Sequence, residues 1–385
     1  MFNTLDRIII LDGATGTELQ KRGLPSGACP EKWVLEHPEA IKEVQRNYAD
    51  AGSDFVYAPT FGANRINLKN HGITESVSSI CRSLVSISRD AVPDHVLVGG
   101  DISSTGLQLF PFGTATYDEI VDVYREQAEA LEEAGVDFYG IETQISLYEA
   151  RAALTAVKQV SKKPVLVTFS CNSSGRSIMG ANLISALLCA QDMGADAFGI
   201  NCCGDLGLVS RLLGEINEYS RIPLIAKPNA GLPITENGKI RYAMTPEQFV
   251  AAVPDFVNSG AAMIGGCCGT NKAHIAALSA AVKGLKPLPH NPVKTSAAAS
   301  QTAVVDVTES TCMAEIPVDD DLTENMAEAM AEGAELLRLH IRDEDDIDCV
   351  DSCQYALTMP LAVSFESDEL KEKFLYVYHG KPYIL

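Results

Sequence analysis

Two pairs of adjacent cysteines are the residues in this 385-residue chain that are best suited to chemistry. Cys202 and Cys203 stand in the stretch FGINCCGD, and Cys267 and Cys268 stand in MIGGCCGT. A single buried cysteine is usually a small, inert core residue. Two pairs that meet at one edge of a fold favour thiolate ligands instead. Three thiolates form a plausible zinc site whose fourth position stays open for a substrate, and coordination there deprotonates a substrate thiol.

The glycines around the second pair bear on whether both of its thiols can reach one ion. Neighbouring side chains on a strand point to opposite faces, so Cys267 and Cys268 converge only where the strand has begun to turn. Gly265, Gly266 and Gly269 permit that turn. We therefore expect the pair at the point where a strand gives way to a loop.

Eight short apolar runs, separated by helix-like segments, must position these cysteines. Each run is almost continuously apolar, as in a parallel strand buried on both faces, and several helical segments end in a glycine suited to the left-handed cap position. Eight such units in about 285 residues predict a (β/α)8 TIM barrel rather than the alternative, a doubly wound sheet. The runs begin at Arg7, Asp54, Val96, Phe138, Pro164, Ala197, Pro223 and Ala261.

The active site of such a barrel lies at the C-terminal ends of its strands, which here carry both cysteine pairs and several polar residues. Asp12 opens the stretch DGATGT after the first strand, Asp101 ends the third, and Glu142 ends the fourth. A glutamate at the end of a buried strand is seldom there for packing. Lys227 ends the seventh strand, a position that leaves open a Schiff-base aldolase-type barrel.

The distribution of charge predicts a second, smaller unit after the barrel. The whole chain has a net charge of −21, but residues 301–385 alone hold 20 acidic and 5 basic side chains. We expect a barrel over residues 1–285, a proline-rich and then small-residue linker over 286–302, and a small acidic α/β unit over 303–385. The charged run RDEDDID, residues 342–348, is predicted to be a solvated face.

Composition also limits the partners and the compartment. The negative charge argues against nucleic acid or an anionic membrane as a partner, and no apolar stretch reaches the roughly 18 residues of a membrane helix. The first residues read as a strand and not as a signal peptide. Eleven cysteines, four of them in adjacent pairs, suit a reducing compartment, so we expect a cytoplasmic protein.

Several motifs together resemble the homocysteine S-methyltransferase family over residues 5–285. The stretches are ILDGATGTELQKRG, ANRINLKNHG, IETQISLYEARAA, INC, KPNAGLP and GGCCGT. The family includes the homocysteine-binding module of cobalamin-dependent methionine synthase, to which the opening stretch is similar. The resemblance implies zinc-dependent methyl transfer to the thiol of homocysteine, giving methionine.

The same resemblance implies roles for individual residues. Zinc would be held by Cys202, Cys267 and Cys268, with the homocysteine sulfur as fourth ligand. The amino-acid end of homocysteine would be held by Asp12, Glu142 and the backbone of residues 13–17, including Gly13, Ala14 and Thr15. Asn229 would lie near the zinc when the thiol is absent. Cys203 lies outside the family motif; we expect it to be a small core residue, with a thiol that supports the ligands or a competing ligand as the alternatives.

The methyl donor is left open by the sequence. No D-x-H-x-x-G corrinoid-ligand motif occurs in the chain, so methylcobalamin would be supplied by a separate corrinoid protein, or by a folate or cobalamin module on another chain. A sulfonium or a quaternary ammonium donor is equally open. A non-catalytic subunit that binds zinc and presents homocysteine to a partner is the alternative to an enzyme.

Overall fold

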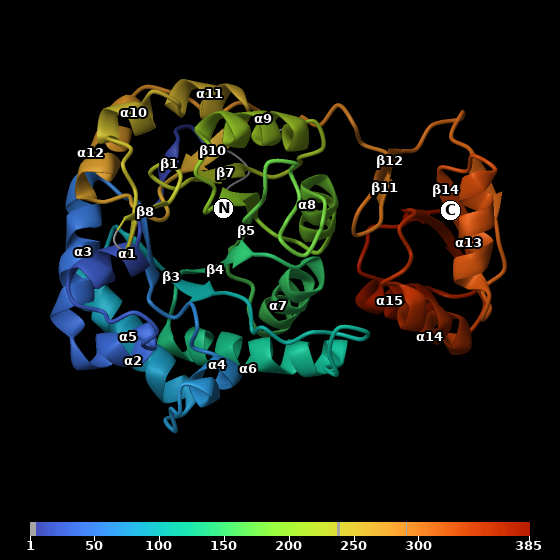
Figure 1. The fold of residues 1–385 in the computed structure, drawn as a ribbon, viewed down its shortest axis with the longest axis horizontal. Helices are drawn as coiled ribbons and strands as arrows, with labels where there is room; N and C mark the ends of the chain where they lie inside the picture. The colour runs from blue at the N-terminus through green and yellow to red at the C-terminus, as the bar shows by residue number, and fades with distance from the viewer. Residues whose placement is uncertain (1–4, 237–238, 290) are drawn as a thin grey trace.

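The computed structural model describes residues 5–236, 239–289 and 291–385. Eight parallel strands form one sheet in the order β1-β10-β7-β6-β5-β4-β3-β2, and helices surround it (Figure 1). Each of the eight predicted runs contains one of these strands, which confirms the barrel. The strands are β1 (Ile9–Ile10), β2 (Phe55–Ala58), β3 (Leu97–Ile102), β4 (Phe138–Gln144), β5 (Val165–Phe169), β6 (Ala197–Asn201), β7 (Leu224–Lys227) and β10 (Ala261–Ile264).

The first and last strands in this order, β1 and β2, are joined by hydrogen bonds in which side chains take part. The Asp54 N–H donates to the Ile10 carbonyl at 2.7 Å, and the Ile10 N–H donates to the Asp54 carboxylate at 2.8 Å. One step along, the Tyr57 N–H donates to the carboxylate of Asp12 at 3.0 Å. Asp12 therefore helps to close the barrel as well as standing at its rim.

Helices between the strands cover the outside of the barrel. Gly52 and Gly135 follow α3 and α6 with φ of 103° and 80°, the left-handed cap that the sequence predicted. The barrel helices are α1 (Gly16–Lys21), α2 (Pro30–Glu36), α3 (Pro38–Ala51), α4 (Arg65–Asn70), α5 (Val77–Ala91), α6 (Tyr117–Ala134), α7 (Leu147–Val160), α8 (Leu183–Asp192), α9 (Leu206–Asn217), α10 (Pro246–Val250), α11 (Val253–Asn258) and α12 (Lys272–Ala281). A hairpin of β8 (Ile234–Glu236) and β9 (Lys239–Arg241) follows β7.

The inside of the barrel changes from apolar to polar along the strands. Phe138, Ala197 and Ile225 belong to the inner apolar cluster, with Ile9, Leu11, Phe55, Tyr57, Leu166 and Met263. Side chains alternate along a strand, so the inward positions nearer the C-terminal rim are Glu142, Asn201 and Lys227. The strand period thus places a polar layer directly beneath the rim.

The C-terminal residues form a second parallel sheet with its own core, beside α7 and α8 of the barrel (Figure 1). The unit contacts the barrel through Arg151, which donates to the Leu375 carbonyl at 2.8 Å, and through Tyr376, whose hydroxyl donates to Asp118 at 2.6 Å. Its elements are β13 (Met313–Glu315), β14 (Leu336–Ile341), β15 (Leu361–Phe365), β16 (Tyr383–Ile384), α13 (Leu322–Ala331), α14 (Glu344–Cys353) and α15 (Asp368–Val377).

Two stretches of this region are more ordered than their composition suggested. The stretch 286–302 contains β11 (Ala297–Ala299), which pairs with β12 (Val304–Asp306) and is buried. The charged run 342–348 begins α14. Asp343 caps this helix, and Asp346 is buried and paired with Arg342 at 2.6 Å. Arg342, Asp343, Glu344, Asp345 and Asp348 are exposed, as predicted for a solvated face. Asp346 is the one buried charged residue of the run, which its pairing allows.

No helix in the described part of the chain is both long enough and apolar enough to cross a membrane.

Gly140 tests the packing inside the barrel. A Cβ at this position would lie 2.2 Å from the Tyr57 ring, so Gly140→Ala should destabilise the fold by about 1–3 kcal/mol through overpacking. Gly214→Ala in α9 is the control, because its Cβ would meet its nearest neighbour, Ser259 Oγ, only at 3.9 Å. Urea unfolding should show a lower midpoint for the first variant alone. Equal midpoints would contradict the interior packing described here.

Candidate active site

Three of the four paired cysteines meet at the rim of the barrel. The Sγ atoms of Cys202, Cys267 and Cys268 all lie within 4.8 Å of one another, and those of Cys202 and Cys268 are 3.9 Å apart. In the described residues this is the one group of three or more His, Cys, Asp or Glu side chains close enough to share a metal ion. The structure thus brings together the three cysteines that the sequence selected.

The backbone turns sharply where the triad forms. Cys202 follows β6 with φ of 55°, a left-handed conformation that non-glycine residues rarely adopt and that is often found at functional sites. β10 ends at Ile264, so Cys267 and Cys268 lie in the following turn, and Gly269 has φ of 83°. The strand has turned before the second pair, as the glycines predicted.

Asn229 and Tyr242 lie beside the triad. The Asn229 amide hydrogen-bonds the Cys202 thiol, and its Oδ1 atom is buried without a hydrogen-bond partner. The hydroxyl of Tyr242 hydrogen-bonds Cys268, and the Tyr242 side chain packs against the turn at Gly269. Hydrogen bonds from the thiols of Cys202 and Cys267 lower the pKa of Cys268, whereas the pKa values of Cys202 and Cys267 themselves are raised.

Cys203 faces away from the triad. Its side chain is buried in the main apolar core, its Sγ lies 3.9 Å from the Asp205 carbonyl, and its thiol hydrogen-bonds Cys171. The observed position is that of a core residue.

A buried ion cluster lies beneath the triad. Lys227 Nζ is 2.6 Å from Glu142 Oε1 and 3.0 Å from Asp12 Oδ1, and it lies 4.0 Å from the centroid of the Tyr57 ring. The side chains of the three charged residues are at most 9% exposed. In so dry a setting each charge depends on its partners.

The titration of this cluster follows from burial and from its partners. Burial by itself lowers the pKa of Lys227, but the Asp12 and Glu142 carboxylates outweigh burial and hold that pKa well above its usual value. A Schiff-base lysine must lose its proton to attack, so this arrangement argues against the aldolase alternative. Burial raises the pKa of Asp12 to about 6, although Lys227 opposes the rise.

The stretch that begins at Asp12 is tied to the turn that carries the second cysteine pair. Because β1 and β10 are neighbours, the Gly266 N–H reaches the Asp12 carbonyl at 2.9 Å, and the Gly269 N–H reaches Thr17 Oγ1 at 3.1 Å. The Ala14 N–H donates to Thr270 Oγ1 at 3.0 Å. The resemblance implied that backbone N–H groups of residues 13–17 bind the substrate, but the Ala14 N–H already donates to Thr270.

A pocket of about 410 Å³ connects the triad with the ion cluster. Gly13, Ala14, Thr15, Glu142 and the three cysteines line this pocket. Asp12 lies behind Lys227, and Asn229 lies behind Cys202. The sequence placed Asp101 and Lys227 at strand ends without assigning either a role in homocysteine binding, and it did not single out Tyr242, which lies beside Cys268. The inward period of β3 and β7 would have indicated the first two, whereas the loop position of Tyr242 carried no signal.

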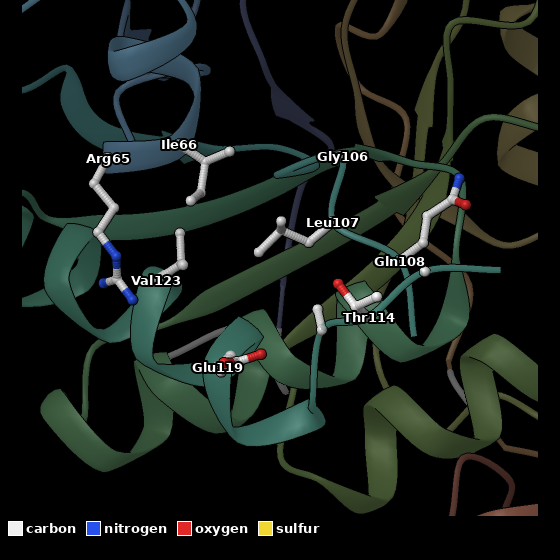
Figure 2. A pocket seen from close by; sticks show the side chains of 10 residues that line it. Arg65, Ile66, Gly106, Leu107, Gln108, Thr114, Glu119 and Val123 are labelled. Carbon is white, nitrogen blue, oxygen red and sulfur yellow. The ribbon is translucent and has the colours of Figure 1, made fainter. Parts of the chain in front are cut away.

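A larger hollow of about 560 Å³ lies between α4, α6 and the loop after β3 (Figure 2). Its charged groups already have partners. Arg65 pairs with Glu126 at 3.0 Å, and Glu119 accepts the Thr116 N–H at 2.8 Å in a capping box. The groups suited to chemistry therefore face the smaller pocket.

Serine substitutions test the ligand set. Cys202→Ser, Cys267→Ser and Cys268→Ser should each strip most of the bound metal, since each removes one of three anionic ligands. Cys203→Ser is the matched control and should keep the metal at a packing cost of at most about 1 kcal/mol. Metal analysis after zinc loading gives the readout. Metal loss in Cys203→Ser with retention in Cys202→Ser would shift the ligand register by one residue.

Comparison with known proteins agrees with this geometry. The homocysteine S-methyltransferase family model matches residues 9–282. Methionine synthases of Mycobacterium tuberculosis and Mycobacterium leprae are each 29% identical over 73% and 72% of the chain, which spans about a quarter of their length. The metallated and apo structures of homocysteine methyltransferase MmuM from Escherichia coli are 26% identical, with TM-scores of 0.60 and 0.57 over 71% of this chain and 96% of theirs. The chain belongs to the homocysteine S-methyltransferase family.

Proposed function

We propose that this protein transfers a methyl group to the thiol of homocysteine and so forms methionine, with zinc held by Cys202, Cys267 and Cys268. The observation that carries the proposal is the convergence of these three thiols within 4.8 Å at one end of the pocket. The family match and the likeness to MmuM, whose title names a homocysteine methyltransferase, support the same reaction.

The donor set fits zinc. Tetrahedral coordination with Zn–S bonds near 2.3 Å separates the sulfur atoms by about 3.8 Å, and the Cys202–Cys268 separation is 3.9 Å. The buried Oδ1 atom of Asn229, which has no partner, offers a neutral oxygen beside Cys202. When bound, zinc would keep the substrate sulfur as a thiolate at neutral pH, where a free thiol is mostly protonated.

The protein's own groups would orient the other end of homocysteine. Glu142 lines the pocket and suits the α-ammonium group, while Asp12 acts from behind through Lys227. The backbone N–H groups of residues 13–17 suit the carboxylate of homocysteine. The Ala14 N–H is the exception, because it already donates to Thr270 Oγ1. In the transfer, the substrate thiol gives its proton to solvent. Its sulfur then forms a bond to the methyl carbon, and the donor's leaving group takes the electron pair of the broken bond.

Two classes of methyl donor are compatible with the proposed reaction. A methyl-corrinoid is one candidate donor, supported by the similarity of this chain to about a quarter of the length of methionine synthases. A small sulfonium or quaternary ammonium compound is the other candidate donor, supported by the pocket of about 410 Å³ beside the triad.

We also keep the division of the chain into residues 1–285, 286–302 and 303–385 as a proposal, supported by the separate apolar core of the last part. All eleven cysteines are free, which supports placement in a reducing compartment such as the cytoplasm.

The acceptor half of the reaction can be tested by calorimetry. Homocysteine binding to the zinc-loaded protein should release roughly one proton near neutral pH, because the bound form is a thiolate. Glu142→Gln should weaken binding by about 1.5–3 kcal/mol, the range for a hydrogen bond to a charged group, without loss of zinc. Titration in buffers of different ionisation enthalpy measures the proton. A zinc X-ray absorption spectrum unchanged by homocysteine would remove sulfur coordination and with it the proposed reaction.

The donor half separates an enzyme from a non-catalytic presenting subunit. The zinc-loaded protein should form methionine from homocysteine with at least one of free methylcobalamin, S-methylmethionine or betaine, and Cys267→Ser should abolish that turnover. Methionine formation is measured by mass spectrometry. Tight homocysteine binding without turnover on any of the three donors would favour the presenting subunit.

A further inference from the structure

Four carboxylates lie at or near the pocket and differ in their contacts. Glu31 lines it and accepts the Gly62 N–H at 2.6 Å. Asp12 accepts the Tyr57 N–H with Oδ2 and faces Lys227 with Oδ1, and it lies outside the pocket lining. Glu142 lines the pocket and has one oxygen on Lys227. Asp101 also lines the pocket, yet its Oδ1 atom is buried without any hydrogen-bond partner in the structure. A buried carboxylate oxygen without a partner is costly and calls for an explanation.

Asp101 belongs to the same inward layer as Glu142. A Cβ at Gly99 would point at the Phe138 ring inside the barrel, so Asp101, two residues further along β3, points inward as well. Asp101 pairs with Gly140 of the adjacent β4, two residues before Glu142. The two carboxylates therefore stand on neighbouring strands at the floor of one pocket.

The position of Asp101 is fixed through its backbone. Its N–H donates to Thr60 Oγ1 at 2.9 Å, and its carbonyl accepts the Thr60 hydroxyl at 2.9 Å and the Gln127 side-chain amide at 3.4 Å. These bonds hold the residue in place without using its carboxylate. The side chain is left for a ligand.

The carboxylates around the pocket outnumber the one ammonium group that contacts them, which favours binding of a second cation. Asp12, Asp101 and Glu142 share one ammonium group, that of Lys227, which contacts Asp12 and Glu142. Burial, and then repulsion from Glu142, raise the pKa of Asp101 well above its usual value. An incoming ammonium group would relieve this repulsion and give the Asp101 carboxylate a partner.

We propose that Asp101 is a substrate-binding residue that receives the α-ammonium group of homocysteine together with Glu142, while Asp12 supports them through Lys227. This inference rests on the proposed function and names a residue that selects amino-acid thiols over simple thiols.

The test compares two thiols on zinc-loaded protein. 4-Mercaptobutanoate is homocysteine without its amino group, so it probes the metal and the carboxylate contacts alone. In Asp101→Asn, homocysteine should bind at least about tenfold more weakly, as for a lost hydrogen bond between charged groups. The affinity for 4-mercaptobutanoate should stay within about twofold, and the zinc content should be unchanged. Calorimetry measures both affinities.

Asp137→Asn is the matched control. Asp137 directly precedes β4 at the opposite end of the barrel, where its carboxylate accepts the Val98 N–H at 2.8 Å and pairs with Arg89 at 2.6 Å. This variant should leave both affinities unchanged.

The outcomes separate the two levels of the proposal. Wild-type affinity for homocysteine in Asp101→Asn, or an equal loss for both thiols, would overturn the role of Asp101 and leave the methyltransferase reaction standing. A wild-type protein that binds neither thiol would overturn the proposed function, and the Asp101 assignment with it.

Discussion

The rest of the site depends on the buried ion pairs that the ammonium group of Lys227 makes with two carboxylates. This ammonium group contacts Asp12 after β1 and Glu142 on β4 while lying over the ring of Tyr57 on β2. The backbone carbonyl of Lys227 accepts the N–H of Cys202, the first thiol of the triad. Removing one partner from such a buried set typically costs about 3–5 kcal/mol, because the remaining charges lose their compensation. Through its side chain and its backbone, Lys227 therefore connects the seam between β1 and β2, the Glu142 carboxylate and the backbone of Cys202.

The loops that follow β1 and β10 line the same pocket and are also joined directly. β1 and β10 are neighbours only because the sheet closes, and their loops exchange hydrogen bonds through Gly266, Gly269 and Ala14. The left-handed backbone at Cys202 brings its thiol to this shared loop region. A substrate that spans both ends would meet a frame that is already assembled, which limits the ordering cost of binding.

The C-terminal unit is attached to the barrel more closely than a flexible linker would allow. β11 lies in the stretch expected to be a linker, and Ala299 exchanges backbone hydrogen bonds with Lys381 at 2.7 and 2.8 Å. Ala298 packs with Leu336 and Ala362 of the second sheet. Small side chains allow this close approach of backbone to sheet. The run of alanines inside the expected linker thus forms a strand that packs against both parts.

The sequence by itself determined the eight strands and their closure, because apolar runs and glycine caps are local signals. It placed both cysteine pairs at one rim, where strand ends in a barrel meet, and the family resemblance then implied Cys202, Cys267 and Cys268 as the ligands. It also indicated Glu142 and Asp12, since charged residues at buried strand ends are rarely there for packing. Only the tertiary structure decided that Lys227 neutralises both carboxylates, that Ala14 has committed its amide, and that Asp101 has an oxygen without a partner. These facts depend on contacts between strands far apart in sequence. Hydrogen bonds form between groups that are close in space, and one amino-acid sequence does not give the distances between residues that lie far apart along the chain.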